Sequence, residues 1–177
     1  DCKIVEQKLP LGLGNAIYLA ADYILGDSFG IILPDDLILH KSSVINKMKS
    51  IYSRYNRNIL YGKYVSKELI ENFGIIETGS KYENLYLIVN KLLEKPNKKD
   101  TDSNLAILGR YYLNVRIFDY LHNLESGYGG EIQLTDALSK MLSDDQFIVI
   151  ESGDYHFDVG NLKGLELAER YINNNPF

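Results

Sequence analysis

Acidic motifs stand where the sequence predicts strand ends and helix starts. The motif PDD, residues 34–36, closes an apolar run, and ligands of open α/β sheets bind beyond the carboxyl ends of strands. An acidic residue there can hold a hard cation, but Asp after Pro is also ordinary turn chemistry, with one Asp capping the next helix. In the motif HFDVGN, residues 156–161, Asp158 lies one turn before a helix. It fits either a second metal ligand or an N-cap arrangement.

Three further motifs have the residue types of a phosphate or sugar site. The motif GLG, residues 12–14, offers backbone N–H groups to a ligand ahead of a helix, although a turn with a cap is the more common explanation. In EKP, residues 94–96, Lys95 can neutralise a phosphate and Glu94 can accept sugar hydroxyls, or the two form a solvated charge pair. The glycine-rich stretch 127–136 reads either as a loop that closes over a sugar or as a flexible loop with an N-cap at Thr135.

Other catalytic chemistries lack their residues. The chain shows no nucleophile elbow, no Cys–His pair and no zinc-binding helix, so covalent catalysis is not indicated. His40 and His122 have no acidic or cysteine partners at metal-ligand spacing, and a lone His156 is more often structural than catalytic. The single cysteine, Cys2, excludes an internal disulfide framework.

Apolar patterning predicts the elements that position these motifs. Helical spacing predicts helices that begin near residues 15, 43, 115, 135 and 162, with Ser43 as an N-cap. Short apolar runs predict strands at 3–7, 29–33, 59–65, 74–77, 85–93, 106–113 and 147–150, with 29–33 buried and a turn at 78–80. Strands that alternate with helices indicate an α/β domain with a mostly parallel sheet, and no linker divides residues 1–177.

Composition limits the class of protein. The chain has 177 residues, of which 45% are hydrophobic and 24% charged, as in one globular domain. A net charge of −5, with Lys98-Lys99 as the only basic run, argues against nucleic-acid binding. No stretch approaches the roughly 20 apolar residues that span a bilayer, and no signal peptide is recognisable, so we expect a cytoplasmic protein. Because it begins at Asp1 and runs at once into an apolar stretch, we expect a piece of a longer polypeptide.

The order of the motifs resembles one family. The succession is EQKLPLGLGNA, GIILPDDLI, FGII, LLEKP, SNLAILGRYYL, GYGGEIQLTDAL and HFDVGNLKG. It is similar to the bacterial UTP–glucose-1-phosphate uridylyltransferases, or UDP-glucose pyrophosphorylases, from Glu6 to about Ala168. The thymidylyltransferases resemble the same layout more distantly. The resemblance implies a Rossmann-like nucleotide-diphospho-sugar transferase fold, with a mixed, mostly parallel central sheet flanked by helices.

The resemblance also implies roles for single residues. Gln7 by its side chain and Gly12 by its backbone match the positions that hold the uracil edge. Asp35 and Asp158 match the two magnesium-binding residues, and Lys95 matches the lysine that contacts the phosphates. The sugar pocket is matched by Gly74, Glu94 and Gly109.

The implied reaction is an in-line displacement. A phosphate oxygen of glucose 1-phosphate attacks the α-phosphorus of UTP, which gives UDP-glucose and pyrophosphate. The protein positions the reactants and neutralises charge through Mg²⁺, Asp35, Asp158 and Lys95. No general base is needed, because the attacking phosphate is already ionised. The family also implies a homo-oligomer.

One family feature does not occur between Asp1 and Phe177, namely the G-x-G-T-R loop that grips the triphosphate. A chain that is N-terminally truncated relative to the family explains this. A non-catalytic remnant that binds a sugar nucleotide or a partner chain is the alternative. A GT-A-like glycosyltransferase that uses Asp35-Asp36 for its metal leaves EIQLTD and the EKP lysine unexplained.

Overall fold

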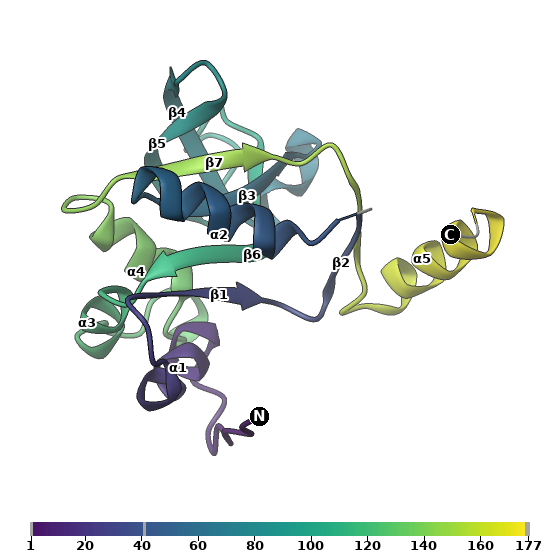
Figure 1. The fold of residues 1–177 in the computed structure, drawn as a ribbon. Coiled ribbons are helices and arrows are strands. Elements are labelled where there is room, and N and C mark those ends of the chain that lie inside the picture. Colours follow the sequence, from purple (N-terminus) through teal and green to yellow (C-terminus); the bar gives the residue numbers. More distant parts are fainter. Residues whose placement is uncertain (1, 41, 176–177) are drawn as a thin grey trace.

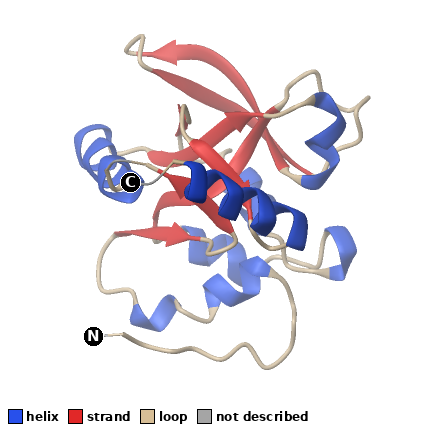
Figure 2. Cartoon of the chain, turned by 90° about the vertical axis from the view of Figure 1, so that its right-hand side faces the viewer, coloured by secondary structure: helices blue, strands red, loops and turns tan. Residues whose placement is uncertain are grey.

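The apolar runs of the chain form a six-stranded sheet in the computed structural model, which describes residues 2–40 and 42–175. Figure 2 shows the strands crossing the molecule with helices around them. Across the sheet the order is β1 (Ser28–Ile32), β6 (Leu105–Asn114), β3 (Asn58–Tyr64), β7 (Phe147–Glu151), β5 (Tyr86–Glu94) and β4 (Gly74–Tyr82). The β4 strand also pairs with the first residues of β6, so β6 lies against three neighbours.

The predicted α/β fold with a mixed sheet is confirmed, but the sheet is not mostly parallel. Among the described strands only β3 and β7 run parallel. The β4–β5 pair turns back on itself at Glu83-Asn84, and such a short connection allows only antiparallel pairing. The β6 strand then runs antiparallel to all three of its neighbours.

Helices cover both faces of this sheet (Figure 1). The helix α2 (Val44–Tyr55) covers one face, and α1 (Leu13–Tyr18), α3 (Ile117–His122) and α4 (Leu134–Met141) cover the other. Along β7, Phe147 packs on the side of α1, α3 and α4, and Ile148 packs on the side of α2. Neither side chain is exposed. This two-sided burial explains the continuous apolar run of a central strand. As predicted, Ser43 caps α2, accepting the Asn46 N–H at 3.4 Å.

A separate two-stranded sheet was not anticipated from the sequence. It pairs β2 (Asp36–Leu39) with β8 (Tyr155–Asp158) and continues into α5 (Leu162–Asn174), which stands apart from the large sheet in Figure 1. Asp154, just before β8, ties the ribbon to β3, because its carboxylate accepts the Tyr61 hydroxyl at 2.5 Å. Burial, followed by this hydrogen bond, raises the pKa of Tyr61 to about 12.

Four local predictions were wrong. Residues 3–7 form no strand, and the first helix begins at Leu13 rather than near 15 and ends at Tyr18. Residues 78–80 lie inside β4, because the hairpin turns where Glu83 and Asn84 adopt φ of 48° and 58°. The strand β1 ends the large sheet instead of lying inside it, and Ile32 is 55% exposed. Apolar runs alone do not distinguish an edge strand from a central one.

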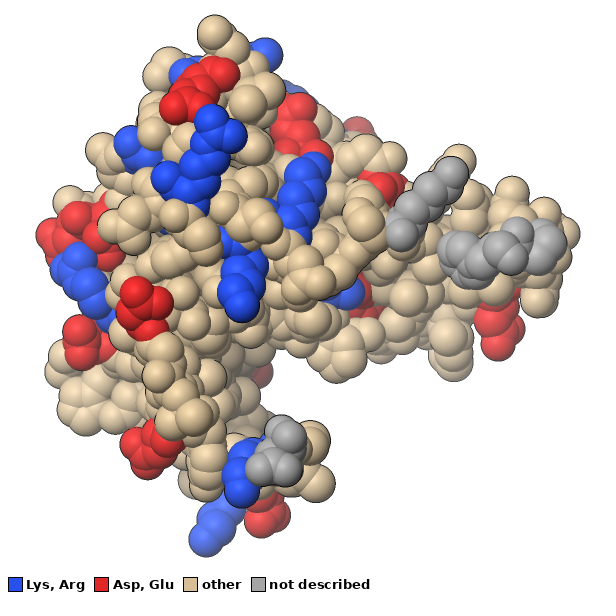
Figure 3. Space-filling model, viewed as in Figure 1, with Lys and Arg blue, Asp and Glu red and all other residues tan. Residues whose placement is uncertain are grey.

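The surface carries charges of both signs. Figure 3 shows Lys and Arg side chains interspersed with Asp and Glu on the face that carries α2. Among the described residues, no helix combines the length and the apolar character that a membrane crossing requires.

Candidate functional site

The two carboxylates predicted to hold a metal lie together at one end of the small sheet. Asp35 precedes β2, Asp158 ends β8, and the Val159 N–H donates to the Asp35 carbonyl at 2.8 Å. Gly160 lies between the two side chains. A Cβ built on Gly160 would stand 3.5 Å from Asp35 Oδ2 and 3.2 Å from Asp158 Oδ1. The β2–β8 pairing therefore brings together two residues that are far apart in the sequence.

The two carboxylates differ in their partners. Asp158 accepts hydrogen bonds from the Gly160 N–H at 3.1 Å and from Asn161 Nδ2 at 2.8 Å. The Asp35 carboxylate accepts none from the part of the chain that the structure describes. No group of three or more His, Cys, Asp and Glu residues within 2–40 and 42–175 could hold a metal. Two carboxylates fit Mg²⁺, which binds proteins through one or two of them and takes its other ligands from water and substrate phosphates.

Asp36 has a different role from its neighbour Asp35. One of its carboxylate oxygens accepts the Gly109 N–H at 2.7 Å, and the other accepts His156 Nε2. Arg110 holds the same turn by donating to the carbonyls of Leu33 and Asp36, both at 2.9 Å. The Asp36 carboxylate is therefore already engaged with the protein, which removes the metal pair Asp35-Asp36 of the glycosyltransferase alternative.

Gly109 lies in a bulge of β6. The register with β3 shifts there, since Leu60 faces Tyr111 while Gly62 faces Ile107. The Gly109 carbonyl accepts the Leu33 N–H at 2.9 Å, so the Gly109 N–H also faces the edge where β1 has ended, and there it donates to Asp36. A side chain at 109 would overlap Asp36 Oδ2 and come within 2.6 Å of Leu33 Cβ. Of the three residues predicted for the sugar pocket, Gly109 is therefore the one that contacts Asp36.

The other two predicted sugar-pocket residues face each other across the β4–β5 pair. Gly74 is the register partner of Glu94. A Cβ on Gly74 would stand 2.9 Å from Thr135 Oγ1 and 3.4 Å from Glu94 Oε2. Thr135 hydrogen-bonds Glu94, whose side chain is 11% exposed. The absence of a side chain at 74 lets Thr135 pack closely against β4 beside the Glu94 carboxylate, which can accept hydroxyl groups.

Lys95 follows directly and is held by its backbone. It has a φ of 43°, and its N–H donates to the Phe73 carbonyl at 3.1 Å. Its ammonium nitrogen lies 3.9 Å from Glu94 Oε1 and 5.3 Å from the centre of the Tyr128 ring. Lys95 and Tyr128 line one cavity of about 610 Å³ together with Glu94. A lysine so placed presents a positive charge at the mouth of that cavity.

Burial raises the pKa of Glu94, and the charges of Asp136 and Glu131 raise it further. The hydrogen bond from Thr135 and the charge of Lys95 lower it, but by less. The folded protein thus binds this proton more tightly than the unfolded chain, so the Glu94 contribution to stability falls as pH rises above about 4.3, the ordinary Glu value. We expect Glu94→Gln to match the wild type in Tm near pH 4 and to exceed it at pH 8.

Thermal unfolding across this pH range tests the expectation. Glu166→Gln, at an exposed position of α5, is the matched control for the loss of one negative charge. A difference between Glu94→Gln and the wild type that stays constant with pH would contradict the argument.

The residues predicted to hold a base form a third group. Gln7 Nε2 donates to the Gly12 carbonyl at 3.1 Å and to Asn15 Oδ1 at 2.8 Å. The loop around Gly12 is joined to Ile132, whose N–H donates to Leu11 and whose carbonyl accepts the Gly14 N–H, both at 2.8 Å. The prediction that Gln7 and Gly12 act together is consistent with their direct contact.

The glycine-rich stretch 127–136 is more ordered than either reading of the sequence assumed. The buried Gln133 donates from Nε2 to the Tyr128 carbonyl at 3.2 Å and to Glu131 Oε2 at 3.1 Å. Gln133, and not Thr135, occupies the N-cap position of α4, without a capping hydrogen bond from its side chain, and Thr135 lies inside the helix and points towards Gly74. The prediction of an N-cap at Thr135 was therefore wrong.

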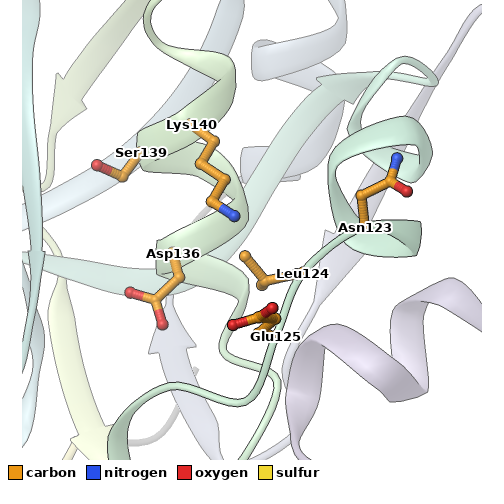
Figure 4. Close-up of a pocket in the computed structure, with 6 residues that line it drawn as sticks. All are labelled: Asn123, Leu124, Glu125, Asp136, Ser139 and Lys140. Atoms are coloured by element: carbon orange, nitrogen blue, oxygen red, sulfur yellow. The ribbon is translucent and has the colours of Figure 1, made fainter.

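Asp136, the residue after Thr135 in α4, packs against the glycine-rich stretch at Gly127. A Cβ on Gly127 would overlap its Oδ2. Figure 4 shows Asp136 and Lys140 from α4 beside Glu125, in a pocket of about 480 Å³ that also includes Asn123, Leu124 and Ser139. Burial raises the pKa of Asp136, while the Lys140 charge opposes the rise. None of the residues predicted for the site lines this pocket.

The three groups have neighbours in common. The pKa of the buried Tyr111 is raised by burial and, after that, by the charges of Asp36, Glu94 and Asp35. The segment 131–136 contacts Gly12 at one end and Gly74 at the other. This segment therefore connects the group around Glu94 with the group around Gln7.

Three contributors were missed by reasoning from sequence. They are Arg110, Gln133 and Thr135. For Arg110 a signal existed, since a charged residue interrupts the apolar run AILGRYYL directly after Gly109. For Gln133 and Thr135, the polar residues of EIQLTD next to an apolar helix face gave no sign of which neighbours they would meet.

Comparison with known proteins decides the family. A family model described as nucleotidyl transferase matches residues 1–175. The chain belongs to this family. A nucleotidyl transferase of Staphylococcus saprophyticus, UTP–glucose-1-phosphate uridylyltransferase 1, is 37% identical over 160 residues, which cover 90% of this chain and 55% of the relative. A UTP–glucose-1-phosphate uridylyltransferase of Bacillus subtilis is 32% identical over 168 residues, 95% of this chain and 56% of the relative. The chain thus spans about half the length of these relatives.

Solved structures of nucleotidyl transferases share the fold. A UDP-glucose pyrophosphorylase complexed with UDP-glucose has a TM-score of 0.87 and 32% identity, over 96% of this chain and 65% of its own. A UTP-bound enzyme of the same name from Acinetobacter baumannii has a TM-score of 0.78 and 30% identity, over 95% and 59%. The resemblance to the uridylyltransferases that the motif order indicated is confirmed.

Proposed function

We propose that this chain forms the sugar-nucleotide site of an enzyme that makes UDP-glucose and pyrophosphate from UTP and glucose 1-phosphate. The observation that carries the proposal is the likeness to a pyrophosphorylase complexed with UDP-glucose, combined with two contacts between predicted residues: Asp35 and Asp158 meet at Gly160, and the segment 131–136 contacts both Gly12 and Gly74. Because the chain spans about half of its relatives, the proposal concerns the part of the reaction that these residues serve.

On this proposal each group of residues binds a different part of the substrate. Gln7 and Gly12 hold the edge of the uracil, where glycine leaves no Cβ between the backbone and the base. Glu94 accepts hydroxyl groups of the glucose in the cavity that it lines with Lys95. Lys95, whose ammonium group lies 3.9 Å from Glu94, binds the phosphates and neutralises part of their charge.

Asp35 and Asp158 would hold Mg²⁺. The bound ion would supply charge neutralisation of the phosphate oxygens during an in-line displacement. The protein's own residues orient the two reactants, and no described side chain has to remove a proton from a phosphate that is already ionised. The enclosed carboxylate of Glu94 acts on the sugar and takes no part in the displacement.

Calorimetric titration of UDP-glucose into the chain, first with Mg²⁺ and then with EDTA, tests the proposal. We expect tighter binding with Mg²⁺. In Asp35→Ala the advantage of Mg²⁺ disappears, while Gln7→Ala weakens binding by about tenfold in both conditions, as the loss of one hydrogen bond of about 1.4 kcal/mol predicts. Asp102→Ala removes a fully exposed carboxylate and serves as the control.

Each result has a distinct meaning. Equal affinity with Mg²⁺ and EDTA in the wild type would contradict the metal pair while leaving the sugar-nucleotide site. No heat in either condition, from a sample shown by circular dichroism to be folded, would contradict the proposed site and favour the non-catalytic remnant.

A further inference from the structure

The two carboxylates of the proposed metal site sit on a ribbon that has little support of its own. The β2–β8 sheet has only two strands and is separate from the six-stranded sheet. Isolated two-stranded ribbons are marginally stable in water, so something must fix this ribbon to the large sheet if Asp35 and Asp158 are to keep a constant separation.

Asp154 attaches the start of β8 to β3, and the Asp36 carboxylate provides a second attachment, at the end of the ribbon that carries Asp35 and Asp158. On one side this carboxylate accepts the Gly109 N–H, which faces the edge of β6 beyond the end of β1. On the other side it accepts His156 Nε2 from β8. His156 faces Ile38 in the register, so its ring reaches diagonally along the ribbon to Asp36. One side chain therefore joins β2, β8 and β6.

Asp36 and His156 each lie close in sequence to a proposed metal ligand, and both side chains are shielded from water. Asp36 adjoins Asp35, and His156 is two residues from Asp158, so each restrains the strand that carries one carboxylate. The side chains of His156 and Asp36 are 9% and 17% exposed. A hydrogen bond of a charged group with so little water access is stronger than a surface pair.

We infer that Asp36 and His156 are positioning residues for the metal carboxylates, and that neither binds the metal. The inference rests on the proposed function, because it assigns to Asp36 and His156 the task of holding Asp35 and Asp158 at metal-binding separation. Outer partners of metal ligands typically change metal affinity by about 10- to 100-fold when they are removed. The expected effect of breaking the pair lies in that range.

The test measures UDP-glucose affinity by calorimetry with Mn²⁺, which stands in for Mg²⁺, and with EDTA. The ratio of the two affinities reports the metal site alone. In His156→Leu, we expect this ratio to fall by about 10- to 100-fold while the affinity in EDTA stays as in the wild type. His156→Gln places an amide Nε2–H near the position of the ring nitrogen, and we expect it to restore most of the ratio.

The outcomes separate the two proposals. If the wild type binds UDP-glucose equally well in Mn²⁺ and in EDTA, the metal site and the positioning role both fail. Both also fail if Asp35→Ala has the same ratio of affinities as the wild type. A large wild-type ratio that survives in His156→Leu would defeat the positioning role alone. A joint fall of both affinities and of Tm would identify a general structural role and overturn the inference.

A second variant, Asp36→Asn, tests the inference if His156→Leu fails to fold. Asp36→Asn keeps the size of the side chain but cannot accept hydrogen bonds from both Gly109 and His156 through charged oxygens. We expect its Mn²⁺ ratio to fall by about tenfold with an unchanged affinity in EDTA. An unchanged ratio in Asp36→Asn would overturn the inference.

Discussion

In Gly164→Ala, binding of UDP-glucose is expected to lose its dependence on Mg²⁺, with only a small change in Tm. Gly164 lies in the first turn of α5, where its N–H donates to the capping Asn161 at 2.9 Å. A Cβ at this position would overlap the carbonyl oxygen of Asp158. Because both atoms belong to rigid backbone, α5 or Asp158 must move, and Asp158 is one of the two proposed metal ligands.

The small effect on Tm follows from the packing of α5. Its only buried residue is Ala168, and its Tyr171 contacts the rings of Tyr155 and Phe157 on β8 rather than the main core. Displacement of α5 therefore leaves the large sheet intact. We expect the Mg²⁺-dependent gain in UDP-glucose affinity to fall by about 10- to 100-fold, measured by calorimetry.

Gly153→Ala is the matched control, since a Cβ there meets nothing within 4 Å. Amide hydrogen exchange in Gly164→Ala should show lost protection in α5 and retained protection in β7. Wild-type magnesium dependence in Gly164→Ala, or global unfolding, would refute the argument that α5 acts locally on Asp158.

The second large effect is expected for Gly12→Ala, which should lower the free energy of unfolding by about 2–4 kcal/mol. Gly12 has φ of 99° and ψ of 171°, a region open only to glycine. An added Cβ would also come within 2.8 Å of Glu131 Cβ and of the Ile132 carbonyl. The base-side loop would separate from the segment that begins at Glu131, so we also expect UDP-glucose binding to weaken in EDTA as well as in Mg²⁺.

Gly129→Ala separates the two causes. Gly129 has φ of 70° but nothing within 4 Å of a Cβ, so it carries a backbone penalty of about 1 kcal/mol without a clash. Urea unfolding gives both values. If Gly12→Ala costs no more than Gly129→Ala, the close contact with Glu131 and Ile132 contributes nothing.

Secondary structure was predictable where burial repeats along the chain. The helix at 44–55 has a capping Ser43 and an apolar stripe, and β7 has apolar residues on both faces, so each pattern matches its environment. The β2–β8 ribbon was missed because its eight residues are too few for a periodicity to stand out. The turn predicted at 78–80 failed because Thr78-Gly79-Ser80 extends β4 instead.

The site was predictable as a set of motifs but not as an arrangement. The motif order identified Asp35, Asp158, Glu94, Lys95, Gln7 and Gly12 together, since each motif is local in the chain. Their resemblance to a family required no geometry. By contrast, the separate tasks of Asp35 and Asp36 could not be read from two adjacent aspartates, because the difference depends on which one meets Gly109 and His156.

The sequence by itself determined the α/β class, most of the helices and strands, and the nucleotidyl transferase family, because these depend on periodicity and on short motifs. Only the tertiary structure decided which motifs meet. The hydrogen bond from the Gly109 N–H to Asp36, the pairing of β2 with β8 and the contact of Gly12 with Ile132 all join residues far apart in the chain. Such contacts arise when the sheet closes and brings particular backbone groups face to face, and no local pattern specifies those partners.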